Sequence, residues 1–401
     1  MSQAAARVSE VKSEKQPLVI WVLFFACIIS FMGLGLVDPI LPAIGAQMHA
    51  SPSQVSLLFT SYNAIMGISM IFTGMVSSEI GIKWTLIAGV CLVILFSALS
   101  GSSSSISQII WFRVGWGLGN ALFIATALSA IVSLSNSGPL KSIILYEAAI
   151  GLGISVGPLL GGELGAITWR GPFYGVSVLM VIVLIALLIK MPNLPKSDKK
   201  ISILDPLKAL TNRGLFTLGL TAFLYNIGFF TLLAFTPFIL AEMGLKEHGL
   251  GYVFLGWGIA LAFTSVLVAP RMQEYIGAIK SMCWVLFLFA LTLISMGIGV
   301  DSELWLITAV VIAGLFLGAN NTLITTSVMN VSTVDRGVAS AAYNFVRFLG
   351  GAVGPWLAPK LAESFNPRVP FYVGGAFVLI GVLTVWANKK HLSHVDHIEG
   401  H

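Results

Sequence analysis

Charged side chains are scarce in this chain. Only 10% of its 401 residues are Asp, Glu, Lys or Arg, whereas 57% are hydrophobic. A soluble domain carries about 25% charged residues, so this chain could not cover a folded core with a polar surface. The composition therefore indicates an integral membrane protein. Its apolar runs are continuous rather than alternating with polar residues, which favours membrane-spanning helices over a closed β-barrel.

Cysteine is also rare, and the sequence lacks the motifs of common catalytic sites. Cys27, Cys91 and Cys283 all lie in apolar runs without CxxC spacing, so neither a disulfide framework nor a metal site is expected. We find no Ser/His/Asp constellation, phosphate-binding loop or ATP-binding motif. The sequence therefore predicts no enzyme and no cofactor, and any work must draw on an ion gradient.

Twelve apolar segments are long enough to cross a membrane as helices. We expect these helices at 18–46, 53–76, 83–101, 107–134, 140–165, 171–190, 213–242, 249–270, 279–299, 303–330, 336–363 and 370–389. The predicted fold is an all-α integral membrane protein with two six-helix bundles, 18–190 and 213–389. A linker at 191–212 joins the bundles, and short tails occupy 1–17 and 390–401.

The placement of the basic residues predicts the orientation. Most Lys and Arg residues lie in the tails, the linker and alternate loops, and only Arg170, Lys246, Lys360 and Arg368 would lie on the opposite side. This bias predicts that both termini and the linker are cytoplasmic. It also explains the formal net charge of +5 without a nucleic-acid partner.

The two halves repeat the same motifs six helices apart. Asp38-Pro39 in helix 18–46 corresponds to Thr236-Pro237 in helix 213–242. Further matched pairs are Tyr146 with Tyr343, Gly153 with Gly350, Gly157 with Gly354, Pro158 with Pro355, and Ile80-Gly81 with Ile276-Gly277. Such parallel repeats are typical of transporters whose substrate site lies between the halves.

The stretch 153–162 has a face without side chains. Gly153, Gly157 and Gly161 are four residues apart, so a neighbouring helix can approach their backbone, and Pro158 removes one main-chain donor. Static packing explains most such faces. Because the second half repeats the pattern, we interpret these residues as a gating hinge: Gly153, Gly157, Pro158, Gly161, Gly162, Gly350, Gly354 and Pro355.

The chain resembles, over essentially its whole length, the major facilitator superfamily and, within it, the twelve-helix drug:proton antiporters; four motifs carry the resemblance. The motifs are GxxxGPxxGG at 153–162, Asp38-Pro39-Ile40-Leu41-Pro42, Arg113-x-x-x-Gly117, and Trp169-Arg170 followed by Pro172-Phe173. The third departs from the family pattern, because Trp116 stands where a glutamine is common. The resemblance implies a monomer in the bacterial cytoplasmic membrane.

The resemblance also implies a substrate cavity lined by the first, fourth, seventh and tenth helices. Aromatic rings with scattered amides suit flat, weakly polar or cationic molecules. The expected cavity residues, with two from the second helix, are Phe31, Tyr62, Asn63, Trp116, Asn120, Phe123, Tyr225, Asn226, Phe229, Asn320 and Asn321.

Few ionisable residues lie deep in the helices, where each charge costs ~2.5–3.5 kcal/mol or more. Asp38 and Arg113 should lie at similar depth in one half, which predicts an ion pair that is either permanent or part of proton coupling. Desolvation and the arginine would act in opposite directions on the protonation of Asp38. Glu147 is a second candidate for proton coupling, although a structural pairing with Arg347 or another cation is the preferred interpretation.

The loop between the second and third helices departs most from the family. Gly74, Glu79, Gly81 and Lys83 occupy a cytoplasmic gate motif in which the acid is displaced by one position and the first arginine is missing. Arg347 in helix 336–363 is assigned to the same gate and is expected to be paired or bonded to carbonyls. We therefore expect a weaker or differently built cytoplasmic latch.

The residues and the resemblance together predict proton-coupled efflux of amphipathic or cationic small molecules by alternating access. The expected partners are the substrate, protons and the lipid bilayer. An exporter of one native metabolite, such as a siderophore, sugar or antibiotic, is the alternative, and sodium coupling stays open. Retention of Asp38 and of the Gly-Pro stretch disfavours a receptor that has lost transport.

Overall fold

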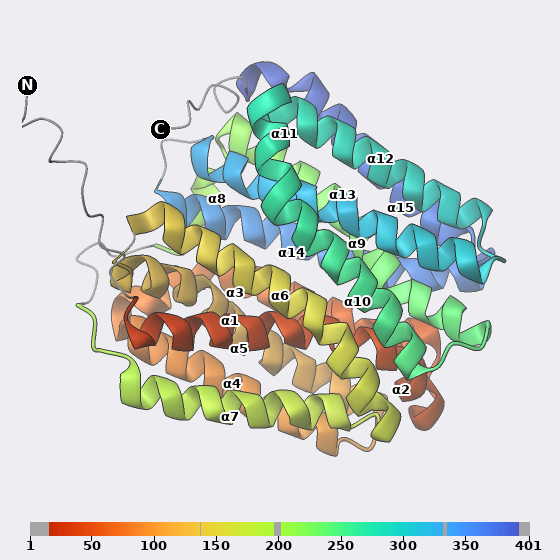
Figure 1. Cartoon of the computed structure of the whole chain (residues 1–401), viewed down its shortest axis with the longest axis horizontal. Coiled ribbons are helices and arrows are strands. Elements are labelled where there is room, and N and C mark those ends of the chain that lie inside the picture. Colours follow the sequence, from red (N-terminus) through yellow and green to blue (C-terminus); the bar gives the residue numbers. More distant parts are fainter. Residues whose placement is uncertain (1–15, 137, 196–201, 332–334, 393–401) are drawn as a thin grey trace, which may run out of the picture.

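The computed structural model describes residues 16–136, 138–195, 202–331 and 335–392, and these residues fold into helices without a β-strand. Figure 1 shows two groups of helices, one red to yellow-green and one green to blue. The first contains α1 (Leu18–Gly35), η2 (Asp38–Ile40), α2 (Leu41–Met48), α3 (Pro52–Ile80), α4 (Ile82–Ser102), α5 (Ile106–Leu134), α6 (Gly138–Ile167) and α7 (Gly171–Lys190).

The second group follows the short helix α8 (Leu204–Ala209). It contains α9 (Arg213–Glu242), α10 (Glu247–Phe263), η3 (Thr264–Val268), α11 (Ala269–Ile276), α12 (Ala278–Ile298), α13 (Glu303–Asn330), α14 (Arg336–Ser364) and α15 (Val369–Ala387), and the chain continues into η4 (Lys389–His391). The predicted all-helical architecture of two groups is confirmed.

Eleven of the twelve expected spans are long and apolar enough, among the described residues, to cross a membrane. The remaining one, α14, is 29 residues long but contains Arg347, Lys360, Glu363 and several glycines and prolines. It packs against α3 of the first half and α9 of its own half. Because its neighbours are protein helices, α14 needs less apolar side chain than a helix that faces lipid.

Two of the expected single helices are irregular. Where 18–46 was expected to be one helix, α1 ends at Gly35, a 3-10 turn covers Asp38–Ile40, and α2 starts at Leu41. Where 249–270 was expected, a π-helical segment separates α10 from α11. Pro39, Pro42 and Pro270 lie at these points, and each lacks the N–H that a regular helix would use.

The repeat is visible in the backbone at two glycine turns. Gly81 joins α3 to α4 with φ 89° and ψ 157°, and Gly277 joins α11 to α12 with φ 85° and ψ 154°. Positive φ is costly for residues with a side chain, so both matched positions require glycine. The two halves therefore turn from their second to their third span in the same way.

The halves meet along two helix pairs, α3 with α14 and α6 with α10. Thr60 Oγ1 donates to Ala352 O at 2.9 Å in the first pair, and Ser155 Oγ donates to Gly258 O at 2.6 Å in the second. The repeat relates α3 to the span containing α10, and α6 to α14, so the two contacts are equivalent by pseudosymmetry. This interface is where a site between the halves would lie.

Candidate functional site

Asp38 is fully buried in the irregular segment that follows α1. This segment packs against α6 of its own half and against α9 and α10 of the other half. Among the described residues, neither carboxylate oxygen of Asp38 has a hydrogen-bond partner. The side chain of Asp38 is thus held by packing rather than by hydrogen bonds. Its oxygens can therefore accept a proton or bind a cation.

Arg113 on α5 is fully buried and rests on two aromatic rings. Its guanidinium carbon lies 4.5 Å from the ring centroid of Tyr62 and 4.7 Å from that of Trp116, and its Nε donates to Leu58 O at 3.4 Å. Within the described residues, its Nη1 and Nη2 atoms have no hydrogen-bond partner. The rings therefore supply much of what holds this cation.

The expected direct pair of Asp38 with Arg113 is not formed among the described residues. The two groups are near enough to interact electrostatically, but they share no hydrogen bond or salt bridge. The aromatic rings occupy the arginine instead. Trp116, at the position where the family often has glutamine, is thus a ring that supports the charge of Arg113.

An amide ties this first polar cluster to three helices. Asn120 Nδ2 on α5 donates to Ser30 O of α1 at 3.2 Å and also to the hydroxyl of Tyr62 on α3. The Tyr62 and Trp116 rings meet edge to face at 6.4 Å. Arg113, Tyr62, Trp116 and Asn120 thus form one connected cluster in the first half.

A second polar cluster lies in the other half. Tyr225 of α9 donates its hydroxyl to Asn321 Oδ1 of α13 at 3.0 Å, and Arg347 Nη2 of α14 donates to the same oxygen at 3.3 Å. The Arg347 guanidinium lies 5.9 Å from the Tyr343 ring. Arg347, expected at a cytoplasmic gate, is therefore part of a polar cluster that joins α9, α13 and α14.

Other expected cavity residues have different neighbours. Phe123 packs against the backbone of Gly89 on α4, and Phe31 meets Tyr146 of α6 at 6.1 Å. Two amides donate to their own helices, Asn63 to Phe59 O at 3.0 Å and Asn226 to Ala222 O at 2.8 Å. Asn320 is buried, and among the described residues its amide has no hydrogen-bond partner. The side chain of Glu147 lies outside the described part of the structure.

The structure adds Phe59 and Trp257, two aromatic residues that sequence reasoning missed. Phe59 of α3 meets Phe230 of α9 at 6.2 Å across the interface, and Phe229 stacks on Trp257 of α10 at 5.9 Å. Phe59 lies one helical turn before Asn63, so helical spacing could have identified it. The centre of the interface is therefore more aromatic than expected.

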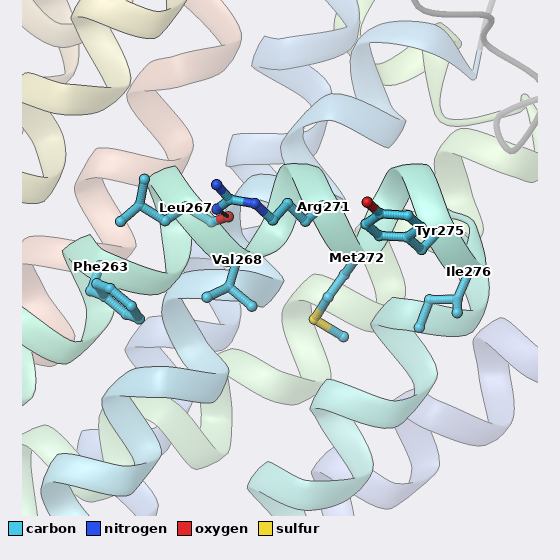
Figure 2. Close-up of a pocket in the computed structure, with 7 residues that line it drawn as sticks. All are labelled: Phe263, Leu267, Val268, Arg271, Met272, Tyr275 and Ile276. Carbon is cyan, nitrogen blue, oxygen red and sulfur yellow. Dashed lines mark hydrogen bonds between the residues drawn. The ribbon is translucent and has the colours of Figure 1, made fainter.

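The expected cavity residues are closed over in this structure. All except Asn321 are buried. The two described hollows lie elsewhere: one on η3 and α11 around Arg271 (Figure 2), the other beside Arg213 and Thr217 of α9. The candidate site thus consists of one packed polar and aromatic cluster in each half, with the Phe59–Phe230 contact between the halves.

The predicted glycine faces are close helix contacts. A Cβ on Gly153 would lie 2.5 Å from Ile28 O, and one on Gly157 would lie 2.7 Å from Met32 O, while Gly161 faces the backbone of Leu36. In the second half, Gly350 and Gly354 face Phe223 and Ile227 of α9 in the same way. A Cβ on Gly162 would instead lie 2.6 Å from Glu247 O of α10.

Neither helix breaks at its proline, since α6 continues through Pro158 and α14 through Pro355. The structure therefore shows the tight packing, and the bending at these residues stays a prediction. The glycine face has a second role, because it lets α1 and the segment containing Asp38 lie directly on α6.

The loop of the expected cytoplasmic gate has few contacts. Glu79 is exposed at the end of α3, and among the described residues neither Glu79 nor Lys83 forms a salt bridge. Gly81 makes the turn between α3 and α4, and Gly74 lies within α3. A latch at this loop stays a prediction.

Comparisons with known proteins agree over nearly the whole chain. The model of the Major Facilitator Superfamily matches residues 23–266 and 218–397. The multidrug efflux protein YfmO of Bacillus subtilis (strain 168) is 55% identical over 380 residues, covering 95% of each chain. The quinolone resistance protein NorA of Staphylococcus aureus (strain MRSA252) is 24% identical, covering 93% of this chain and 97% of that protein.

Solved structures share the fold at low identity. A bacterial homologue of the human lysosomal transporter Spinster has a TM-score of 0.78 at 16% identity, covering 96% of this chain and 98% of its own. The human organic anion transporter MFSD10 (TETRAN) has a TM-score of 0.72 at 16% identity, with 92% and 98% covered. These two likenesses concern the fold alone.

Proposed function

The chain belongs to the Major Facilitator Superfamily, and on that premise we propose that it exports amphipathic or cationic small molecules in exchange for protons. As a member of this family it is a multi-pass membrane transporter and not an enzyme. The name of its 55% identical relative, a multidrug efflux protein, supports a broad substrate range.

The observation that carries this proposal is the buried carboxylate of Asp38. Its oxygens have no hydrogen-bond partner among the described residues, and the segment around it touches both halves. A charged group in the membrane needs a partner or water. A proton satisfies Asp38 in one state and a cationic substrate, or water in an open cavity, satisfies it in another.

Arg113 sets the competition at this acid. The positive charge of Arg113 interacts with Asp38 although the two side chains form no direct pair. The rings of Tyr62 and Trp116 and the carbonyl of Leu58 hold Arg113 in place. A substrate cation near Asp38 would be repelled by Arg113 and attracted by the acid and the ring faces. Small movements of the arginine would therefore change whether proton or substrate is preferred.

We propose that the protein works as a monomer. Alternating access would move its bundles 18–190 and 213–389 relative to each other. The helix contacts α3–α14 and α6–α10 would then separate in turn, with the residues around Pro158 and Pro355 as the bending points. We place both termini on the cytoplasmic side of the cell membrane, as the bias of basic residues favours.

Efflux from cells tests this function. We expect cells that express the chain to export several chemically unrelated dyes and antibiotics, and a proton uncoupler to abolish export. Replacing external sodium with potassium is the control for the coupling ion and should have no effect. Export that survives the uncoupler would reject proton antiport, and export of one compound alone would favour a dedicated metabolite exporter.

A further inference from the structure

The hollow on η3 and α11 has a composition that differs from the substrate site. Its volume is about 430 Å³, and it is lined by Phe263, Leu267, Val268, Arg271, Met272, Tyr275 and Ile276. In Figure 2 the side chains of Phe263, Val268, Met272 and Ile276 follow one edge of the helix, and Leu267, Arg271 and Tyr275 lie along the other. We propose that this groove binds one anionic phospholipid.

The fold builds the groove from an irregular helix. Pro270 lies just after the π-helical segment, and two hydroxyls anchor that segment to α13: Ser265 Oγ donates to Gly318 O at 2.8 Å, and Thr322 Oγ1 donates to Ser265 O at 3.1 Å. Met272 packs on a small buried cluster formed by Ala269 with residues of α12 and α13. The side of η3 and α11 that faces α12 and α13 is therefore fixed. The opposite side, widened by the π-helical turn, forms the hollow.

The apolar lining of the groove is exposed on the outer surface of the helix bundle. Phe263 is 53% exposed, Leu267 43% and Ile276 44%, on a helix of a membrane-spanning segment. Exposed apolar side chains of this kind face acyl chains in a bilayer. The groove thus offers one acyl chain a fixed contact rather than a smooth helix surface.

The polar rim suits a lipid phosphate. Arg271 Nη1 donates to Leu267 O at 2.5 Å, and the guanidinium has further N–H donors that can bind phosphate oxygens. Arg271 precedes the turn at Gly277 by six residues, or about 9 Å of helix, which is a headgroup depth. Tyr275 is 80% exposed and is a typical interfacial residue.

Charge favours an anionic lipid over the exported substrate. Arg271 is the charged residue of the lining, Lys280 is exposed just beyond the turn, and Glu274 is exposed on α11 without lining the groove. A cationic drug would be repelled by Arg271. In the orientation proposed above, this end of α11 lies in the cytoplasmic leaflet, where anionic lipids attract basic residues.

Native mass spectrometry of the purified, delipidated full chain tests the site. With phosphatidylglycerol and phosphatidylcholine of identical acyl chains, we expect preferential retention of phosphatidylglycerol. Arg271→Gln should weaken that binding roughly tenfold, as expected for a lost hydrogen-bonded charge contact. Arg271→Lys should keep part of the preference. Arg336→Gln, which changes an exposed arginine at the same end of the bundle, is the matched control and should keep all of it.

A photoreactive phosphatidylglycerol supplies the location. We expect cross-links within residues 263–276, reduced by Arg271→Gln and unchanged by Arg336→Gln. Equal retention of the two lipids, or cross-links confined to other helices, would overturn the proposal. Displacement of the lipid probe by an exported dye would also overturn it, because the groove would then belong to the substrate.

Discussion

The matched motifs Asp38-Pro39 and Thr236-Pro237 differ in backbone structure. In the first half the helix breaks before Asp38, and a 3-10 turn carries the acid. In the second half α9 runs from Arg213 to Glu242 without a break at Pro237. Both side chains are buried, and among the described residues neither the Asp38 carboxylate nor the Thr236 hydroxyl has a hydrogen-bond partner.

The difference shows that the fold needs neither the acid nor the break. The proline alone does not interrupt α9, so the irregular backbone at Asp38 is a feature of the first half. Irregular backbone in a membrane persists where protein or a water-filled cavity surrounds it. The first half thus holds the candidate proton site, while the second half holds the Tyr225–Asn321–Arg347 cluster.

The largest effect is expected from removing the acid of the first half. Asp38→Asn keeps the side-chain volume but cannot release a proton, so uphill efflux should fall to the level of cells without the transporter. Thr236→Ala at the matched position should leave efflux within about twofold, because removing a buried polar group without a partner is close to neutral. Uphill export by Asp38→Asn at the unsubstituted rate would rule out this acid as the proton site.

The second effect concerns the glycine faces, which the halves share. Gly157→Leu and Gly354→Leu would drive side chains into Met32 O and Ile227 O, so both variants should lose transport. Gly249→Leu is the control, since the nearest atom to its added Cβ is 3.5 Å away on the Leu245 side chain. Normal transport by either α6 or α14 variant would contradict the close contact.

Bending and static packing are separated by the prolines of the same faces. Pro158→Ala restores a backbone donor in α6 without adding bulk. If α6 bends during transport, the rate should fall several-fold while thermal stability is kept or raised. An unchanged rate would support static packing, and Pro355→Ala would show whether α14 behaves alike.

A smaller effect is expected from the rings that hold Arg113. Trp116→Leu removes one of its two aromatic supports and should weaken drug-dependent proton exchange by roughly twofold to thirtyfold, the range of one cation–π contact. Trp116→Phe keeps a ring and should do less harm. The readout is the substrate concentration at half-maximal rate across external pH, which a merely structural defect would not shift.

The smallest effect is expected at an exposed contact between the halves. His248 of α10 and Glu163 of α6 approach to 3.1 Å, with about half of each side chain exposed. Such pairs contribute about 1 kcal/mol or less, so His248→Gln should change transport by less than about fivefold. A complete loss of transport would mean that this pair is a gate rather than a minor contact.

Sequence reasoning predicted the helical spans and the internal repeat because each depends on hydropathy or on motif spacing. It could not place Arg113, since a buried cation can be satisfied by a carboxylate or by rings, and only the packing of Tyr62 and Trp116 decides. Helical spacing also assigned Phe123 to the cavity; its backbone lies close to Gly89 of α4, and its place in the cavity stays a prediction.

The breaks in the first and eighth spans escaped prediction for a related reason. Pro39, Pro237 and Pro270 all lie inside apolar segments. Pro237 lies in a regular helix, whereas Pro39 lies in a 3-10 turn and Pro270 follows a π-helical segment. Neighbours decide which occurs: α6, α9 and α10 surround the Asp38 segment, and hydroxyls link α13 to the π-helical segment.

The composition of α14 has a consequence for how the protein is made. The helix α14 carries four charged residues: Arg336, Arg347, Lys360 and Glu363. Without partner helices it should partition weakly into lipid during synthesis. Its partners α3 and α9 are synthesised earlier and can receive it. We therefore expect sequential assembly, in which α14 inserts by packing against α3 and α9 after these helices are in the membrane.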